Sequence, residues 1–186
     1  MGRSITGGSS VRHIDSRPLL EDPIVIVLDD SIAIDATPAD IAAFVANLDA
    51  NYTLLSDDHI HFASLTGDPT TEGATFCQFE YFRERIVGGR YLVESVDPER
   101  RYVFAVTGPR SLLGGRLEFS IEPTADGVVL TERLELGYSV PLVSAVVDRL
   151  VGIAFADTID ALRAHQREGL ENFRTAIETG TATLDP

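Results

Sequence analysis

The segment FADTIDALRAHQREGLENFRTAIETG, residues 155–180, decides the fold. It closes a helical pattern that starts near Pro141 and ends at Thr179, where Gly180 favours a stop. Its apolar side chains recur at the helical period and form one stripe: Phe155, Ile159, Leu162, Phe173 and Ile177. A long helix with one apolar face must bury that face against another element.

Upstream of this helix, the chain is an almost unbroken series of strand patterns. Six segments rich in β-branched and aromatic residues are separated by turn residues: 60–65, 74–86, 90–96, 102–107, 115–121 and 128–138. The second segment is expected to turn into the third at Gly88-Gly89. In the last segment, one set of side chains faces one way: Val128, Leu130, Leu134, Leu136 and Tyr138. The opposite set is Thr131, Arg133 and Glu135. Short turns at this spacing predict an antiparallel meander.

A strand and a helix precede the meander. Residues 24–34 read as a strand that Asp29-Asp30-Ser31 interrupts, as a bulge or an edge position. Thr37 is a good N-cap for a helix that begins at Pro38. Its apolar stripe is Ile41, Phe44, Val45 and Leu48, and residues 47–58 are irregular or form a second short helix. The predicted class is α+β: a curved antiparallel sheet of six to seven strands around the C-terminal helix, with a cavity where the two do not touch.

The domain boundaries follow from composition. Residues 1–22 are rich in Gly, Ser and Arg and predict a tail, 23–180 predict one domain, and 181–186 predict a second tail. A chain of 186 residues with the single Cys77 has no disulfide framework, which fits a reducing cytoplasm. The sequence contains no secretion signal and no apolar run of membrane-spanning length, so we expect a cytoplasmic protein without integral membrane association.

The charge balance is strongly acidic. Asp and Glu number 29 against 15 Lys and Arg, giving a formal charge of −14, and every one of these cations is arginine. An acidic surface repels phosphate backbones, so nucleic acid is not an expected partner. GC-rich coding or a salt-rich, halophilic cytoplasm accounts for the composition, and neither bears on activity.

The order strand, helix, six-stranded meander and long C-terminal helix resembles the helix-grip (SRPBCC) superfamily. This superfamily includes START lipid-transfer domains, birch-pollen-allergen-like proteins and aromatic polyketide cyclases. The resemblance covers about residues 24–179 and rests on this layout and on three local patterns: ATPADI at 36–41, EGATF at 72–76 and VDPERR at 96–101. It implies a cavity for a lipid, sterol, isoprenoid or polyketide, with cyclisation, dehydration or hydrolysis in some members, and the fold does not choose among these.

One constellation suits a metal ion. His59 precedes the first strand of the meander, Glu80 lies mid-strand between Phe79 and Tyr81, and His165 lies on the closing helix. Two imidazoles and a carboxylate suit zinc, and three protein ligands leave one position open for water. The set looks like the metal site of the phloroglucinol-type carbon–carbon hydrolases. That site implies a fourth ligand, a helical Glu four residues after the His, where this chain has Gly169; only Glu168 could substitute.

Structural interpretations compete with this one. His165 also fits a satisfied histidine at the core edge, one of His59 and His61 must face solvent, and Cys77 reads as an inert buried thiol. Glu80 also fits an ion pair across strands, with Arg83, Arg85 or Arg90. The candidate lining of the cavity is Phe76, Gln78, Phe82, Tyr91, Phe104, Phe119 and Leu162.

Two functions remain open at this level. The first is binding of a hydrophobic small molecule, such as a lipid, an isoprenoid or an aromatic polyketide, without a certain cofactor. The second is a metal-dependent hydrolase or cyclase for an aromatic or polyketide-like substrate, with zinc at His59, Glu80 and His165 and with Glu84 or Glu168 as candidate bases. A regulatory relative acting on a protein partner is a third interpretation.

Overall fold

The computed structural model describes residues 25–108, 115–137 and 156–184. The elements follow in the order β1 (Val25–Ile34), α1 (Pro38–Ala46), α2 (Leu48–Asn51), η1 (Tyr52–Leu54), β2 (His59–Thr66), β3 (Thr75–Phe82), β4 (Arg85–Asp97), β5 (Arg101–Thr107), β6 (Arg116–Thr124), β7 (Gly127–Gly137) and α4 (Ala156–Glu178). Tyr138 and the part of the predicted closing helix before Ala156 lie outside the described residues. The predicted α+β class and order of elements are confirmed.

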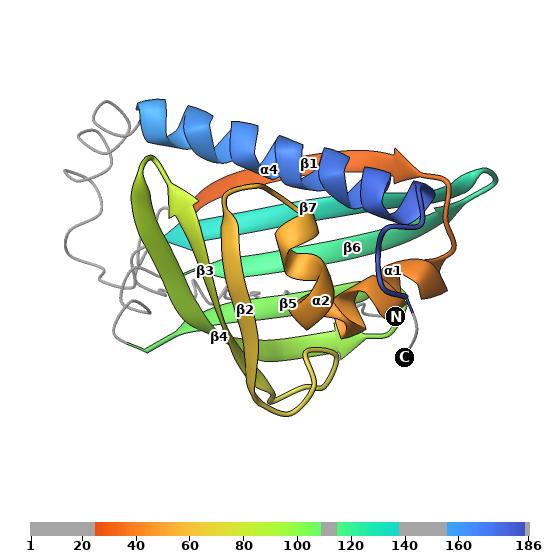
Figure 1. Cartoon of the computed structure of the whole chain (residues 1–186), viewed down its shortest axis with the longest axis horizontal. Coiled ribbons are helices and arrows are strands. Elements are labelled where there is room, and N and C mark those ends of the chain that lie inside the picture. Colours follow the sequence, from red (N-terminus) through yellow and green to blue (C-terminus); the bar gives the residue numbers. More distant parts are fainter. Residues whose placement is uncertain (1–24, 109–114, 138–155, 185–186) are drawn as a thin grey trace, which may run out of the picture.

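The strands form one seven-stranded sheet in the order β1-β7-β6-β5-β4-β3-β2, and every neighbouring pair is antiparallel. The sheet curves, and α4 runs along its hollow side next to β1 (Figure 1). The first helix, α1, lies near the end of the sheet where α4 finishes. This is the arrangement expected when a single long helix has to bury one face against a sheet.

The start of α1 follows the sequence signals closely. The Thr37 side chain accepts a hydrogen bond from the Asp40 main-chain N–H at 3.3 Å, and the Asp40 carboxylate accepts one from the Thr37 N–H at 2.8 Å. This reciprocal pair is a capping box, with Pro38 at the first helical position. The cap orients α1 so that Phe44 reaches Phe173 of α4, with ring centroids 4.1 Å apart.

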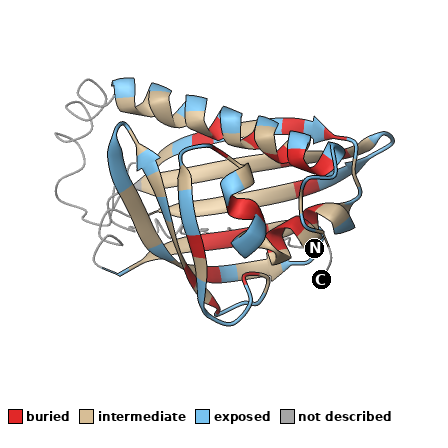
Figure 2. Cartoon of the chain, in the orientation of Figure 1, coloured by how far each residue is buried: buried red, intermediate tan, exposed pale blue. Residues whose placement is uncertain are grey.

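The core occupies one end of the molecule. Leu170, Phe173, Ala176 and Ile177 of the C-terminal half of α4 are buried, whereas Ile159 and Leu162 of its N-terminal half are only half-buried. Figure 2 shows the same polarity, with buried residues concentrated towards the C-terminal end of α4 and on α1. Phe155, predicted to share this stripe, lies outside the described residues. The C-terminal half of α4 therefore packs more tightly against the rest of the protein than the N-terminal half does.

One sequence-based expectation is wrong in detail. The turn between β3 and β4 lies at Arg83 and Glu84, which take positive φ values of 49° and 63°, not at Gly88-Gly89. The glycines lie inside β4, where a Cβ on Gly88 would collide with the Gln78 carbonyl and come within 2.6 Å of the Phe79 ring. Close approach of a neighbouring strand, rather than a turn, therefore explains Gly88.

For Asp29-Asp30-Ser31 in β1, the structure decides between the two predicted alternatives, a bulge and an edge position. The pairing of β1 with β7 runs without a register shift from Val25 to Ile34, so Asp29-Asp30-Ser31 is not a bulge. These residues do lie on an edge strand, because β1 ends the sheet. An acidic edge position blocks pairing with another strand without breaking the ladder.

Candidate functional site

A cavity of about 270 Å³ lies between the inner face of the sheet and α4, which lines it from Leu162 to Phe173. Six of the seven residues predicted to line a cavity are in its wall: Phe76, Gln78, Tyr91, Phe104, Phe119 and Leu162. The seventh, Phe82, is not in the wall; its ring lies edge-on to His165, with centroids 6.4 Å apart. Most of the wall is therefore apolar and aromatic.

The aromatic side of the wall is held by ring contacts across strands. Phe76 stacks on Tyr91 with centroids 5.2 Å apart, and it meets Phe104 edge-on at 5.2 Å. The Gln78 amide donates a hydrogen bond to the Tyr91 hydroxyl at 3.3 Å. Contacts of this kind fix the rings in place, so the wall is largely preformed for a flat apolar ligand.

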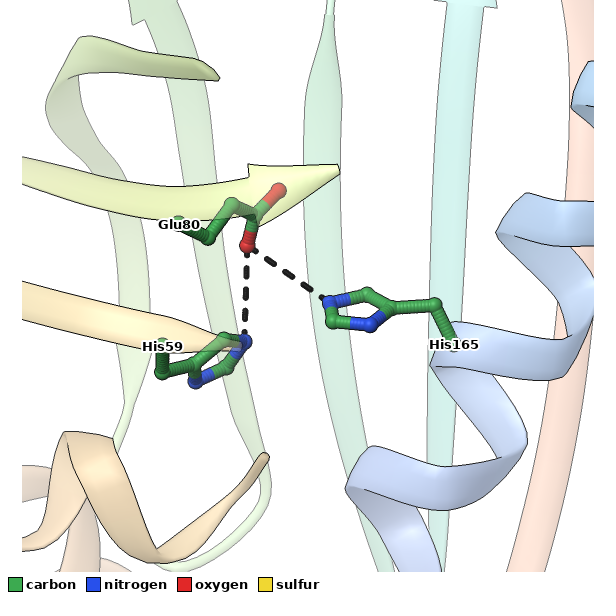
Figure 3. Close-up of side chains that lie close together, drawn as sticks. All are labelled: His59, Glu80 and His165. Carbon is green, nitrogen blue, oxygen red and sulfur yellow. Dashed lines mark ion pairs between the residues drawn. The ribbon is translucent and has the colours of Figure 1, made fainter. Parts of the chain in front are cut away.

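His59, Glu80 and His165 meet at one end of this cavity. His59 and Glu80 face each other across the β2–β3 ladder, and His165 reaches them from α4 (Figure 3). One Glu80 oxygen, Oε2, lies 3.4 Å from His59 Nε2 and 3.6 Å from His165 Nε2. The side chains are only 10%, 20% and 19% exposed. Glu80 therefore faces inward and does not pair with Arg83, Arg85 or Arg90, whereas His61 is exposed.

The His59 ring is fixed from behind. Its Nδ1 lies 2.9 Å from the Tyr52 main-chain oxygen, and the two rings stack with centroids 4.1 Å apart. A carbonyl oxygen only accepts hydrogen bonds, so Nδ1 carries the proton. In a neutral His59 the lone pair is then on Nε2, which faces Glu80 Oε2. Two lone pairs at this separation repel each other unless a proton or a cation lies between them.

The electrostatics of the cluster favour an ionised carboxylate. Burial alone would raise the pKa of Glu80, but hydrogen bonds with His165 and His59 and their positive charges outweigh it and lower the pKa to about 2. The same hydrogen bond with Glu80 raises the pKa of His165, against the opposing effect of burial. Glu80 is therefore an anionic centre that two imidazoles surround.

The hydroxyl of Tyr52 is the third polar feature at this end. Tyr52 is 3% exposed, lines the cavity, and its hydroxyl oxygen has no hydrogen-bond partner among the described residues. Burial raises the pKa of Tyr52, and the charge of Glu80 and a hydrogen-bonding interaction with its carboxylate raise it further, so the hydroxyl keeps its proton. The hydroxyl lies near Glu80 without a hydrogen bond of good geometry, which leaves it able to donate to a group that the cavity receives.

Sequence reasoning also missed Glu132, an acidic residue of the cavity wall. It lies on β7 in the inward-facing row Val128, Leu130, Glu132, Leu134 and Leu136. Burial raises the pKa of Glu132 to about 8, against the opposing effects of the His165 charge and a hydrogen bond with Gln166. The signal was available in the sequence, because strict alternation along residues 128–138 places Glu132 among the apolar side chains.

The two candidate bases lie elsewhere. Glu84 is exposed at the tip of the β3–β4 hairpin. Glu168 is also exposed, and its carboxylate accepts a hydrogen bond from Ser56 at 3.2 Å. Neither lines the cavity, so a role as a base there is not supported.

The family model for polyketide cyclase / dehydrase and lipid transport proteins matches residues 26–178. The chain belongs to this family. Comparison with curated protein sequences found no match. The family and the fold together place the chain in the helix-grip superfamily.

Solved structures show the same fold at low identity. The di-domain ARO/CYC protein StfQ of the steffimycin biosynthetic pathway has a TM-score of 0.63 and 16% identity over 84% of this chain. This chain spans 52% of StfQ. A protein from Thermus thermophilus has a TM-score of 0.66 and 11% identity, over 84% of this chain and all of its own. Major latex-like protein 151 of Panax ginseng has a TM-score of 0.57 and 9% identity, and the match covers 77% of this chain and 94% of the ginseng protein.

In this family member, the His59, Glu80 and His165 side chains form a group that could hold a metal ion after a small inward movement. Two ligand atoms of a tetrahedral zinc site, each about 2.0–2.1 Å from the metal, lie about 3.3 Å apart. The 3.4 Å and 3.6 Å separations around Glu80 Oε2 are close to this value and longer than a good hydrogen bond. All three ligand atoms lie within 4.8 Å of one another.

Gly169 stands where a fourth protein ligand is expected from the resemblance. It lies in the cavity wall, and a Cβ there would meet only the Leu55 carbonyl oxygen, at 3.9 Å. The position therefore adds space next to His165 instead of a donor.

No helix in the described part of this family member is long and apolar enough to cross a membrane.

Proposed function

We propose that the chain binds a hydrophobic small molecule carrying an oxygen atom, and that His59, Glu80 and His165 orient this oxygen through a zinc ion. The observation that carries the proposal is the position of the cluster: three ligand atoms within 4.8 Å of one another at one end of a mainly apolar cavity. The family supports a hydrophobic ligand, and the donor set supports the metal.

Each end of the cavity contributes differently. The aromatic wall gains about 25 cal/mol for each Å² of apolar ligand surface removed from water, without regard to orientation. Orientation comes from the polar end, where the Tyr52 hydroxyl lacks a partner among the described residues and is available to donate to a ligand oxygen. The Tyr52 carbonyl holds the His59 ring so that Nε2 points into the cluster. Backing of this kind is typical of metal-ligating histidines.

A second candidate function is a metal-dependent hydrolase or cyclase for an aromatic or polyketide-like substrate in the same cavity. Two features favour it: three protein ligands leave a position open, and the set resembles that of the phloroglucinol-type hydrolases. A zinc ion there would supply Lewis acidity and a water of lowered pKa. The chain would contribute the Tyr52 hydroxyl as a donor to the reacting oxygen, the aromatic wall for orientation, and the first half of α4 as a cover against solvent.

Zinc binding tests the proposal most simply. Calorimetric titration of the chelator-treated protein should show one zinc site per chain, and His165→Ala should weaken it by more than about 10-fold, since even the loss of groups behind a ligand costs 10- to 100-fold. His61→Ala is the matched control, because His61 lies on the same strand as His59 and is exposed. Zinc affinity that is equal in the wild type, His165→Ala and His61→Ala would contradict the proposal.

A further inference from the structure

Glu132 interrupts an apolar row at the centre of β7. Its neighbours in the row are Leu130 and Leu134, and Phe119 pairs with it across the β6–β7 ladder. A carboxyl group in such a row lowers the stability of the fold unless something compensates for its burial. Leucine at this position would extend the row, so the structure of the sheet gives no reason for an acid.

The surroundings of Glu132 compensate for its burial only in part, through the charge of His165 and a hydrogen bond with Gln166. Arg167, on the facing helix, donates to Asp30 at 3.3 Å and to Glu171 at 2.9 Å. Asp30 lies opposite Glu132 in the β1–β7 ladder, and Arg167 forms its ion pair with Asp30 and not with Glu132. No ion pair with Glu132 occurs in the part of the chain that the structure describes. The Gln166 amide donates to the Glu132 main-chain oxygen at 2.9 Å, which ties β7 to α4 and positions Glu132 in the cavity wall.

We propose that Glu132 is a second ligand-contacting residue, which selects a ligand carrying a second hydroxyl or carbonyl group besides the one held by the His59–Glu80–His165 cluster. The inference rests on the proposed function, because it assumes that the cavity receives the ligand. A protonated carboxyl group donates to a carbonyl, and either protonation state accepts from a hydroxyl. Burial raises the pKa of Glu132 to about 8, which agrees with both modes of contact.

The two acids also define what the cavity disfavours. Glu80 and Glu132 are both in the wall, and the guanidinium of Arg116, the wall's arginine, pairs with Glu94 at 2.8 Å. A hydrocarbon would leave the Glu132 carboxyl group without a hydrogen-bond partner from the ligand. A ring compound with two separated oxygens offers one oxygen to the His59–Glu80–His165 cluster and one to Glu132. The inferred class is therefore a polyoxygenated aromatic molecule rather than a hydrocarbon.

A cycle of ligand and protein changes tests the role of Glu132. We would measure calorimetric dissociation constants for 1-naphthol and 1,5-dihydroxynaphthalene, which share a ring system and differ by one hydroxyl group. In the wild type, the second hydroxyl should tighten binding by about tenfold, the effect of one well-placed hydrogen bond. In Glu132→Leu this gain should disappear. Glu135→Gln is the control, because Glu135 lies on the outer face of β7 and pairs with Arg133 at 2.8 Å.

Measurements on further variants distinguish this inference from the proposed function and from a purely structural role of Glu132. His165→Ala should weaken both naphthols but keep the gain from the second hydroxyl, whereas a cluster that plays no part would leave both affinities unchanged. Glu132→Leu should raise the melting temperature, because it completes the apolar row; Glu132→Gln, which keeps the shape, provides a folded second variant. A gain that is absent in the wild type, a gain that survives Glu132→Leu, or a fall in melting temperature would overturn the inference.

Discussion

Glu80 and Glu132 both line the cavity, but their surroundings shift their pKa values in opposite directions. Two imidazoles hold the pKa of Glu80 at about 2, whereas burial among apolar side chains raises that of Glu132 to about 8. The difference lies in the partners, not in depth alone. An acid kept neutral and an acid kept ionised give the cavity one donor-capable end and one cation-binding end.

The raised pKa of Glu132 predicts how the stability of the fold depends on pH. Its pKa rises from an ordinary 4.5 to about 8 on folding, so the folded state holds this proton more tightly than the unfolded state. The resulting stabilisation is complete below pH 4.5 and is lost as the pH rises towards about 8. The contribution of Glu80 runs the other way and is lost as the pH falls below 4.5, outside this window.

Glu132→Gln removes this dependence because an amide does not titrate. We expect the melting temperature of Glu132→Gln, relative to the wild type, to increase between about pH 5 and about pH 8 in metal-free buffer. Thermal unfolding followed by circular dichroism measures the difference. A difference that stays constant across this range would show that Glu132 titrates normally in the folded protein.

At the level of single residues, the sequence contains most of the site but not its full extent. His59, Glu80 and His165 were predictable as a set because each is a metal-ligand type on a separate element, and the structure brings them together. Tyr52 and Glu132 were missed. The unpaired hydroxyl of Tyr52 is visible only after η1 has been placed against β2, whereas Glu132 was visible in the alternation of β7.

The two halves of α4 differ in how deeply their apolar side chains are buried. Phe173 is 4% exposed and packs on Phe44, while Leu162 is half-buried, although both lie in the cavity wall. Truncation of Phe173 removes buried ring contacts of the core, whereas truncation of Leu162 mainly widens a cavity that already exists. The two positions therefore differ in what truncation costs.

Phe173→Ala should lower the free energy of unfolding by about 3–5 kcal/mol, the usual cost of removing a buried aromatic ring. Leu162→Ala should cost less than about 2 kcal/mol, because Leu162 is not fully buried, and should instead weaken ligand binding. Urea unfolding of both variants measures the contrast. Equal losses of stability would mean that Leu162 belongs to the core.

The elements themselves show where sequence patterns stop being informative. The capping box at Thr37 and the stripe of α1 are local, and both were predictable. The β3–β4 turn was not, because Gly88-Gly89 reads as a turn locally while the chain turns at two non-glycine residues with positive φ. What decides the position is contact between strands: Gly88 is needed where Phe79 crosses β4.

For the whole molecule, charge is the dominant global property. A net charge of −14 on 186 residues makes the folded chain repel itself, and salt screens this repulsion. We expect the melting temperature to rise between 0.1 M and 1 M salt, as the Debye length falls from about 10 Å to about 3 Å. Calorimetry at both concentrations measures it. A melting temperature that falls or stays level would mean that the acidic groups do not limit stability.

In the proposed site, β2, β3 and α4 each bring one ligand to a single zinc ion at the end of the cavity. X-ray absorption spectroscopy at the zinc edge, on protein loaded with one equivalent of zinc, tests this most directly. We expect two imidazole nitrogens and one carboxylate oxygen at about 2.0–2.2 Å from the zinc ion. One imidazole should be lost from the spectrum in His165→Ala and none in His61→Ala. A spectrum dominated by sulfur from Cys77, or one that His165→Ala leaves unchanged, would contradict it.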